Sequence, residues 1–168
     1  MKMHNTRTMA APADVAWQVI GERFGDLSWT SSIAHVDLQL LDDVVGEGAT
    51  RVCTSSKGFG PFAAPVLHEK LVHFDRDAMA LTYVVTEGLP PLIRKAENAW
   101  RVVAVDDVTC RVESTATSTL AFWIRPLGPL LARAVNADLQ NVFDELAAAI
   151  EAAAVGSTTS TTSCQDAA

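Results

Sequence analysis

The order of apolar and polar residues divides the chain into two helical stretches separated by a long run with a period of two. Towards the C-terminus, apolar residues recur at spacings of three and four from 130 to about 154, which predicts a long amphipathic helix. Its apolar face consists of Leu131, Val135, Leu139, Val142, Phe143, Leu146 and Ile150. A shorter helix is expected from about 11 to 24, with Pro12 and Asp14 in its first turn.

Between these helices, short segments rich in Val, Leu, Thr and aromatic residues alternate with turns rich in Gly, Pro and Asp, which is typical of strands in an antiparallel meander. The segments are 34–42, 47–55, 65–75, 79–86, 93–105 and 109–121. A first strand at 3–9 precedes the N-terminal helix, and a second short helix is expected at 27–33. The pattern predicts an α+β domain in which a curved antiparallel sheet of about seven strands grips the C-terminal helix.

The length and composition fit one folded domain. The 168 residues are 49% apolar and 20% charged, which is the composition of a globular protein. Residues 156–168 read GSTTSTTSCQDAA, a run too polar to bury much surface, so a disordered tail is expected there. We therefore predict a single domain over 1–155 followed by this tail.

Charge and cysteine content exclude several functions. A net charge of −7 provides no cationic surface for nucleic acid. Cys53, Cys110 and Cys164 form no metal-binding spacing, and no cofactor motif occurs, so we expect neither metal nor cofactor. The N-terminus lacks a signal sequence and no segment is long enough to span a membrane, which indicates a cytoplasmic protein. The oligomeric state is left open.

Strand parity selects the residues that face the space between sheet and helix, because alternate side chains point to opposite faces. On strand 65–75 the odd-numbered residues, which include Glu69 and His73, are expected to face inward. On strand 79–86 the inward set is Leu81, Tyr83 and Val85. Glu69 and the only tyrosine of the chain are therefore predicted to share the concave face.

Several local motifs occur in an order that resembles a known superfamily. They are the opening Ala-Pro-Ala-Asp-Val-Ala-Trp, Trp29, Gly46-Glu-Gly-Ala-Thr-Arg51, the segment 68–75, Leu-Thr-Tyr at 81–83, Trp-Arg-Val at 100–102 and the segment 138–146. Over about residues 3 to 154 the chain resembles the helix-grip (SRPBCC, START-like) superfamily. That superfamily includes START lipid-transfer domains, the birch-pollen-allergen type, plant abscisic acid receptors and bacterial polyketide cyclase/dehydrase proteins. The resemblance implies an internal apolar cavity.

The resemblance also indicates which residues face that cavity. Glu69 aligns with a glutamate that contacts the ligand in the plant receptors, as do Glu113 and the polar helix position Asp138. Parity instead places Glu113 on the outer face of its strand, so its orientation stays open. Arg51 follows the glycine turn Gly46–Gly48, and in the superfamily an arginine after such a turn contacts a ligand or pairs with an acidic neighbour.

The candidate site therefore consists of two sets of residues with different expected roles. Glu69, Arg51 and Tyr83 are the candidate catalytic residues. The candidate ligand-binding residues are Trp29, Phe59, Phe62, Leu71, Leu81, Val85, Trp100, Glu113, Val135 and Asp138. Phe59 and Phe62 are expected in a loop at the cavity mouth, whereas Trp17 and Trp123 are expected to pack in the core.

Two functions fit these residues. The first is a polyketide cyclase/dehydrase-like protein that binds a small hydrophobic carbonyl compound. As an enzyme, it would cyclise or dehydrate that compound, with Arg51 and Tyr83 polarising the carbonyl and Glu69 moving a proton. The second is a non-catalytic carrier or sensor of a hydrophobic ligand or lipid. The distance between Glu69 and Arg51 discriminates them, because a neutralised pair favours structure or ligand orientation and an isolated buried carboxylate favours acid–base chemistry.

Overall fold

The computed structural model describes residues 1–58 and 63–162. Its strands are β1 (Lys2–Met9), β2 (Ile33–Gln39), β3 (Thr50–Ser55), β4 (Val66–Asp75), β5 (Ala80–Glu87), β6 (Ile93–Asp106) and β7 (Thr109–Leu120). Its helices are α1 (Ala13–Trp17), the π-helical turn η1 (Gln18–Glu22), the 3-10 helix η2 (Phe122–Leu127) and α2 (Gly128–Thr162). The predicted α+β helix-grip class is confirmed.

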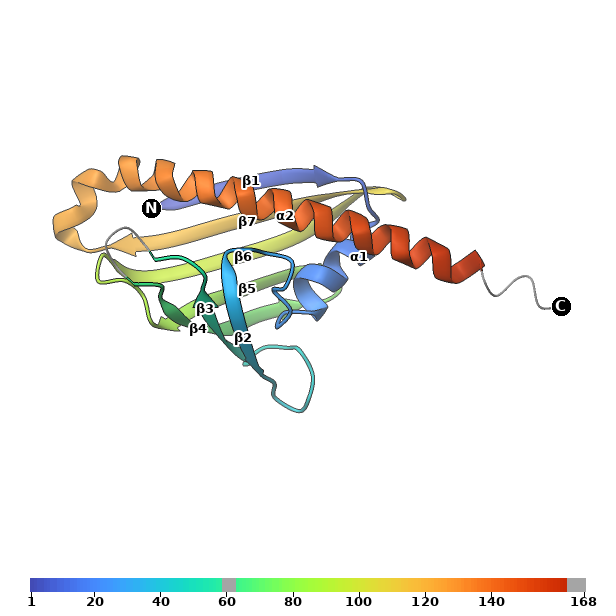
Figure 1. Ribbon diagram of the computed structural model, residues 1–168, viewed down its shortest axis with the longest axis horizontal. Coiled ribbons are helices and arrows are strands. Elements are labelled where there is room, and N and C mark those ends of the chain that lie inside the picture. Colours follow the sequence, from blue (N-terminus) through green and yellow to red (C-terminus); the bar gives the residue numbers. More distant parts are fainter. Residues whose placement is uncertain (59–62, 163–168) are drawn as a thin grey trace.

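All seven strands form one antiparallel sheet. Their order is β1-β7-β6-β5-β4-β3-β2, so the strands from β2 to β7 follow one another as a meander and β1 pairs with the last of them. The sheet curves, and α2 crosses one of its faces with α1 beside the C-terminal half of the helix (Figure 1). The space between sheet and α2 therefore becomes the interior of the domain.

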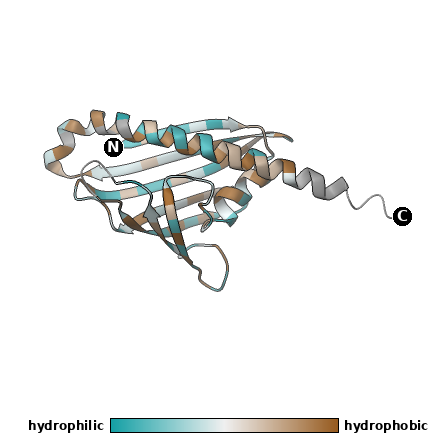
Figure 2. Ribbon diagram, viewed as in Figure 1, coloured by the Kyte–Doolittle hydropathy of each residue, from teal (hydrophilic) through white to brown (hydrophobic). Residues whose placement is uncertain are grey.

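The middle of α2 makes the main contact with the core of the domain. Phe143 stacks on Trp100 of β6 with ring centroids 5.4 Å apart, and Leu146 and Ile150 are fully buried. Hydrophobic and hydrophilic residues alternate along α2, as expected for a helix with one face on the sheet (Figure 2). None of the helices in the described part of the chain is long and apolar enough to cross a membrane.

The N-terminal helix is shorter than predicted and changes its winding. Pro12 occupies the N-cap and Asp14 lies in the first turn, but the α-helical part ends at Trp17 and the chain continues as the π-helical turn. A side chain at Gly21 would place its Cβ 2.6 Å from the Trp17 ring. Glycine at this position lets the buried indole pack against the following turn.

The segment 27–33 forms turns and the start of β2, so the helix predicted there is wrong. The Asp26 carboxylate accepts hydrogen bonds from the backbone N–H of Ser28 at 3.1 Å and from its hydroxyl at 2.6 Å. These bonds also lower the pKa of Asp26. Such a local side-chain turn competes with helical hydrogen bonding, which accounts for the difference.

Two further predictions about side-chain direction are wrong. The register of β4 against β5 shifts between Leu71 and His73, so Phe74 packs against the core and the His73 side chain is exposed. This irregularity inverts the parity of the following residues. Trp123 lies in η2 and is 57% exposed, whereas Ala121 and Ile124 are the buried residues of this turn.

The end of α2 also differs from the sequence prediction. The helix continues through 156–162, where an irregular tail was expected. Extending an existing helix requires no new nucleation, so a polar sequence can continue one without a core to pack against. Residues 163–168 lie outside the described part of the chain, and the division into a domain over 1–155 and a tail stays a prediction.

Deleting residues 156–168 is expected to leave the domain stable. Among the side chains of α2 that the structure describes, the last that packs against the core is Ala154, so the deletion removes none of the core contacts seen among them. Thermal unfolding of the full-length and truncated proteins checks this, with similar midpoints expected. A large decrease on truncation would mean that the tail docks on the domain.

Candidate functional site

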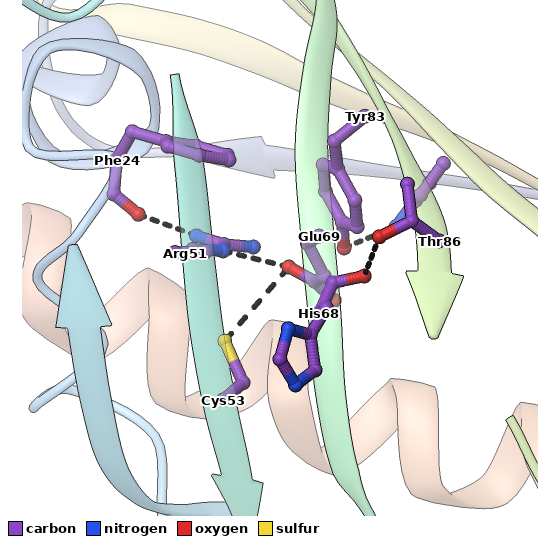
Figure 3. A network of polar contacts seen from close by, with 8 residues as sticks. Phe24, Arg51, Cys53, His68, Glu69, Tyr83 and Thr86 are labelled. Atoms are coloured by element: carbon purple, nitrogen blue, oxygen red, sulfur yellow. Dashed lines mark hydrogen bonds and ion pairs between the residues drawn. The ribbon is translucent and has the colours of Figure 1, made fainter. Parts of the chain in front are cut away.

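Three neighbouring strands bring the candidate catalytic residues together. In the register of the sheet Arg51 on β3 lies opposite Glu69 on β4, and Leu71 of β4 lies opposite Tyr83 on β5. All three side chains point into the space beneath α2 (Figure 3). The parity prediction for Glu69 and Tyr83 is therefore confirmed as a placement, while their chemical roles stay predictions.

Arg51 and Glu69 form a buried ion pair. Arg51 Nε donates to Glu69 Oε2 at 2.6 Å, and the two side chains are only 6% and 9% exposed. Arg51 Nη1 also donates to the backbone carbonyl of Phe24 (Figure 3). Burial is the largest single influence and would lower the pKa of Arg51, but the Glu69 carboxylate, together with Tyr83 and Cys53, outweighs it and the pKa is raised. The guanidinium therefore stays charged, and its ion pair with Glu69 leaves little net charge in the cavity wall.

Aromatic rings enclose the guanidinium of this pair. Arg51 Cζ lies 4.0 Å from the centre of the Phe24 ring and 4.9 Å from that of Tyr83. These distances are within the range of cation–π attraction, which is strongest where water is excluded. The rings also fix the plane of the guanidinium, and Arg51 is held by contacts from three directions.

The Tyr83 hydroxyl is held by donors on β6. Asn98 Nδ2 lies 3.3 Å from the Tyr83 oxygen, and Asn98 Oδ1 accepts a hydrogen bond of 2.9 Å from the buried Ser114 hydroxyl. The Trp100 side chain also donates to Tyr83. Burial, together with the nearby Glu69 carboxylate, raises the pKa of Tyr83 to about 12. Tyr83 is therefore protonated at neutral pH and offers an O–H donor.

Cys53 completes the polar group on β3. Its thiol contacts Glu69 Oε2 at 3.9 Å. Burial is the main cause that raises the pKa of Cys53 to about 12, with a further contribution from Glu69. Because the thiolate is the reactive form, Cys53 is not a nucleophile at neutral pH. Within the described residues no cluster of three or more His, Cys, Asp or Glu side chains could hold a metal ion.

These residues line a cavity of about 200 Å³ between the sheet and α2. Its apolar wall comes from the turn after α1, from the sheet and from α2, and its mouth contains the exposed residues Arg23 and Ser32. The polar side chains described above, Arg51, Cys53, Glu69, Tyr83 and Asn98, also line it. The remaining lining residues are Val19, Ile20, Phe24, Leu27, Trp29, Thr30, Ile33, Leu81, Trp100, Leu139, Val142 and Leu146.

The segment that carries Trp29 is tied to α2 by one carboxylate. Glu145 accepts hydrogen bonds from the Thr30 hydroxyl at 2.7 Å, from the Ser31 backbone N–H at 3.0 Å and from the Ser31 hydroxyl. These bonds, led by that from the Ser31 side chain, lower the pKa of Glu145. The segment after η1, which forms one wall of the cavity, is thus held to α2, which forms another.

Only some of the predicted ligand-binding residues line the cavity. Trp29, Leu81 and Trp100 line the cavity. Leu71 is fully buried in the core and Val85 lies further along β5, and neither lines the cavity. Phe59 and Phe62 lie outside the described residues.

Three assignments on β7 and α2 are corrected. Glu113 lies between the buried residues Val112 and Ser114, so it faces away from the cavity and accepts a hydrogen bond of 2.9 Å from Arg111. Asp138 is exposed and Val135 does not reach the cavity. The helix residues that line it are one turn further along, at Leu139, Val142 and Leu146. Parity gave the correct orientation for Glu113, and the alignment with the receptors did not.

Sequence reasoning missed several cavity residues. Asn98 has the same parity as Trp100 on β6, so the strand pattern contained the signal for it. Cys53 likewise shares its face with Arg51 on β3. Phe24 carried no such signal, because it lies in an irregular turn whose direction depends on the packing of the whole domain.

Comparison with known proteins agrees with this architecture. The fold, with an apolar cavity between the sheet and α2, is that of a START-like helix-grip protein. Residues 1–151 match the family described as "Polyketide cyclase / dehydrase and lipid transport", and the chain belongs to that family. No curated protein matches the chain.

Solved structures show the same fold at low sequence identity. An aromatase/cyclase named Zhui from a Streptomyces species has a TM-score of 0.73 at 13% identity, with 90% of this chain and 93% of that one covered. A START superfamily protein from Mycobacterium smegmatis has a TM-score of 0.71 at 11% identity, with 89% and 97% covered. Norcoclaurine synthase from Thalictrum flavum, in complex with dopamine and hydroxybenzaldehyde, has a TM-score of 0.67 at 17% identity, with 89% and 86% covered.

The single tyrosine allows the environment of the site to be measured directly. Tyr83 is expected to form tyrosinate near pH 12 in the folded protein and near pH 10 in the urea-unfolded protein, because burial disfavours the charged form. A raised folded-state pKa means that Tyr83 contributes stability below pH 10, which is lost as the pH rises from 10 to about 12.

The measurement is an absorbance titration of tyrosinate, with unfolding followed in parallel. Tyrosinate formation and loss of stability should both occur within that pH interval. If Tyr83 ionised at the same pH in the folded protein as in the urea-unfolded protein, its side chain would be solvated. That result would contradict the place of Tyr83 in the cavity wall.

Proposed function

We propose that this protein binds a small, mainly apolar carbonyl compound in the cavity, as a carrier or sensor, without acid–base chemistry at Glu69. The single observation that carries the proposal is the Arg51–Glu69 contact of 2.6 Å in the cavity wall. A carboxylate that acts as a general base must be free to accept a proton from its substrate. The Glu69 oxygen nearest Arg51 is already bound to a guanidinium and contacts a thiol.

The other titratable groups in the cavity support the same reading. Tyr83 and Cys53 both have a pKa of about 12, so neither is an effective base near neutral pH. None of the four histidines lines the cavity as far as the described residues define it. A cyclisation or dehydration needs a group that removes a proton, and these residues do not supply one.

The size of the cavity favours a compact ligand. An apolar protein cavity of about 150 Å³ accommodates benzene. A cavity of about 200 Å³ therefore suits one substituted ring or a short chain of similar size. The norcoclaurine synthase structure holds dopamine and hydroxybenzaldehyde, which are single-ring compounds, so the same fold accepts ligands of this size.

The polar groups of the wall favour a carbonyl on the ligand. The Tyr83 oxygen accepts hydrogen bonds from Asn98 and Trp100, which leaves its O–H as the group to be satisfied. A ligand carbonyl is a matching acceptor, and a buried hydrogen bond of this kind orients an otherwise apolar molecule.

Filling the cavity from α2 is expected to abolish binding while the fold persists. Val142→Phe adds a ring to a side chain that lines the cavity, whereas Val135→Phe makes the same change on the same helix outside it. Added volume in an empty cavity is tolerated, but overpacking of a filled core typically costs about 1–3 kcal/mol. Calorimetric titration with acetophenone and thermal unfolding measure the two effects.

We expect acetophenone to bind the wild-type protein and the Val135→Phe variant but not the Val142→Phe variant. The melting temperature of Val142→Phe should stay near that of the wild-type protein. Strong destabilisation by Val142→Phe would show that sheet and helix are close-packed there. Native mass spectrometry of the purified protein would identify a bound compound directly. Turnover of a carbonyl substrate that is lost in Glu69→Gln would favour the enzymatic alternative instead.

A further inference from the structure

Four large apolar side chains are exposed together where the chain passes from β7 through η2 into α2. Phe122, Trp123, Leu127 and Leu130 are each more than half exposed. We call these four residues the η2 surface. Neighbouring aromatic and leucine side chains in contact with water mark a site of interaction, because single exposed apolar residues are common and clusters of them are not.

The η2 surface lies at a projecting end of the domain. η2 and the start of α2 form the orange segment that extends beyond the sheet, and hydrophobic residues recur along it (Figures 1 and 2). The backbone N–H of Ala121 donates to the Leu92 carbonyl at 2.9 Å, which holds the turn between β5 and β6 beside η2. Lys2 of β1 lines the same groove as Gly128 and Pro129 at the start of α2. Three parts of the chain therefore meet at this end.

The charge around the η2 surface is opposite to that of the whole chain. Residues 88–96 and 114–137 contain Arg and Lys but no acidic residue, although the net charge of the chain is −7. Arg94 and Arg133, like Lys2, are exposed and form no ion pair with the side chains that the structure describes. Exposed apolar side chains and unpaired positive charges thus occur together.

We propose that the η2 surface docks on the surface of an anionic lipid bilayer. Phe, Trp and Leu side chains enter the boundary between head groups and acyl chains, while Lys and Arg beside them contact the anionic head groups. The contact is peripheral and lies outside the ligand cavity, to which the η2 surface contributes no residue. It therefore goes beyond the proposed function and does not depend on it.

The charges favour a bilayer over a second copy of the chain. A symmetric dimer buries the same patch on both copies, so docking through the η2 surface would bring the basic side chains of the two copies together. A protein partner would also need a pocket shaped to the projecting side chains, since protein interfaces are as closely packed as protein interiors. A bilayer accepts such side chains without a preformed pocket.

Trp123 reports docking in the unmodified full-length protein. It is the exposed member of the four tryptophans, because Trp17 and Trp100 are buried and Trp29 is half-buried. Its emission is expected to shift to shorter wavelength with vesicles of phosphatidylcholine that contain about one third phosphatidylglycerol, and much less with phosphatidylcholine alone. Brominated acyl chains should quench the shifted emission, because the indole then lies below the head groups.

Two matched apolar variants locate the contact. Leu130 and Val108 are 68% and 67% exposed, but Val108 lies in the turn before β7, at the opposite end of that strand from η2. Leu130→Ser is expected to weaken cosedimentation with the anionic vesicles about five- to tenfold, the effect of withdrawing part of one leucine from the bilayer. Val108→Ser should change it by less than about twofold.

Two matched charge variants test the lipid head groups. Arg94 and Arg101 are both exposed on β6, and Arg101 lies roughly 20 Å further along the strand, beyond the range of screened charge in about 0.1 M salt. Arg94→Gln is expected to weaken binding to the anionic vesicles about fivefold, and Arg101→Gln by less than about twofold. Thermal unfolding checks that every variant is folded.

Three results would overturn the proposal. The first is no binding of the wild-type protein to the anionic vesicles at low salt, and the second is an equal effect of Leu130→Ser and Val108→Ser. The third is a concentration-dependent dimer without lipid that Leu130→Ser abolishes, which would identify a second copy as the occupant. Ligand binding in the cavity is unaffected by all three, so the proposed function is tested separately.

Discussion

The buried Arg51–Glu69 ion pair is the constraint on which the site depends. Removing two charges from water costs several kcal/mol for each ion unless the partners and hydrogen bonds compensate for it. Here the compensation comes from adjacent strands in register and from the turn after α1, which supplies the Phe24 carbonyl and ring. The register of β3 on β4 and the path of that turn must both be correct before the pair can form. The pair therefore links the sheet, the N-terminal helical segment and the cavity wall.

The same pair determines what the cavity can do. The Arg51–Glu69 ion pair leaves little net charge in the interior, and most of the remaining cavity wall, from α2 and the sheet, is apolar. Tyr83 and Cys53 keep their protons at neutral pH, which supports our proposal that the polar groups orient a ligand and do not exchange protons with it. Members of this family and fold are named as both cyclases and lipid-transport proteins, and the fold alone does not distinguish them. The ion pair of Glu69 with Arg51 is the feature on which we base the proposal that this chain binds a ligand without catalysis.

Local patterns predicted most of the fold, because the strands are short, half-buried and clearly alternating. Parity placed Glu69 and Tyr83 inward and Glu113 outward, which the structure confirms. It failed at His73, where a shift in register between β4 and β5 depends on the neighbouring strand. Two helix residues were misjudged: Asp138 is exposed while the adjacent Leu139 lines the cavity, and Val135, one turn before Leu139, does not reach it. The phase of α2 against the sheet is set by tertiary packing. The turn from Asp26 to Ser28 was not predicted, because the composition of this segment also suits a helix.

A double-mutant cycle on the ion pair tests the account most directly. Arg51→Met and Glu69→Leu each leave one charge buried without its partner, and each is expected to destabilise the fold by about 3–5 kcal/mol. The double variant replaces both charges by apolar groups and should be clearly more stable than either single variant, with a coupling of at least about 1 kcal/mol. The measurement is the free energy of unfolding of the four proteins in urea. Single effects below about 1 kcal/mol that simply add would show an exposed, uncoupled pair and would contradict the buried, neutralised site.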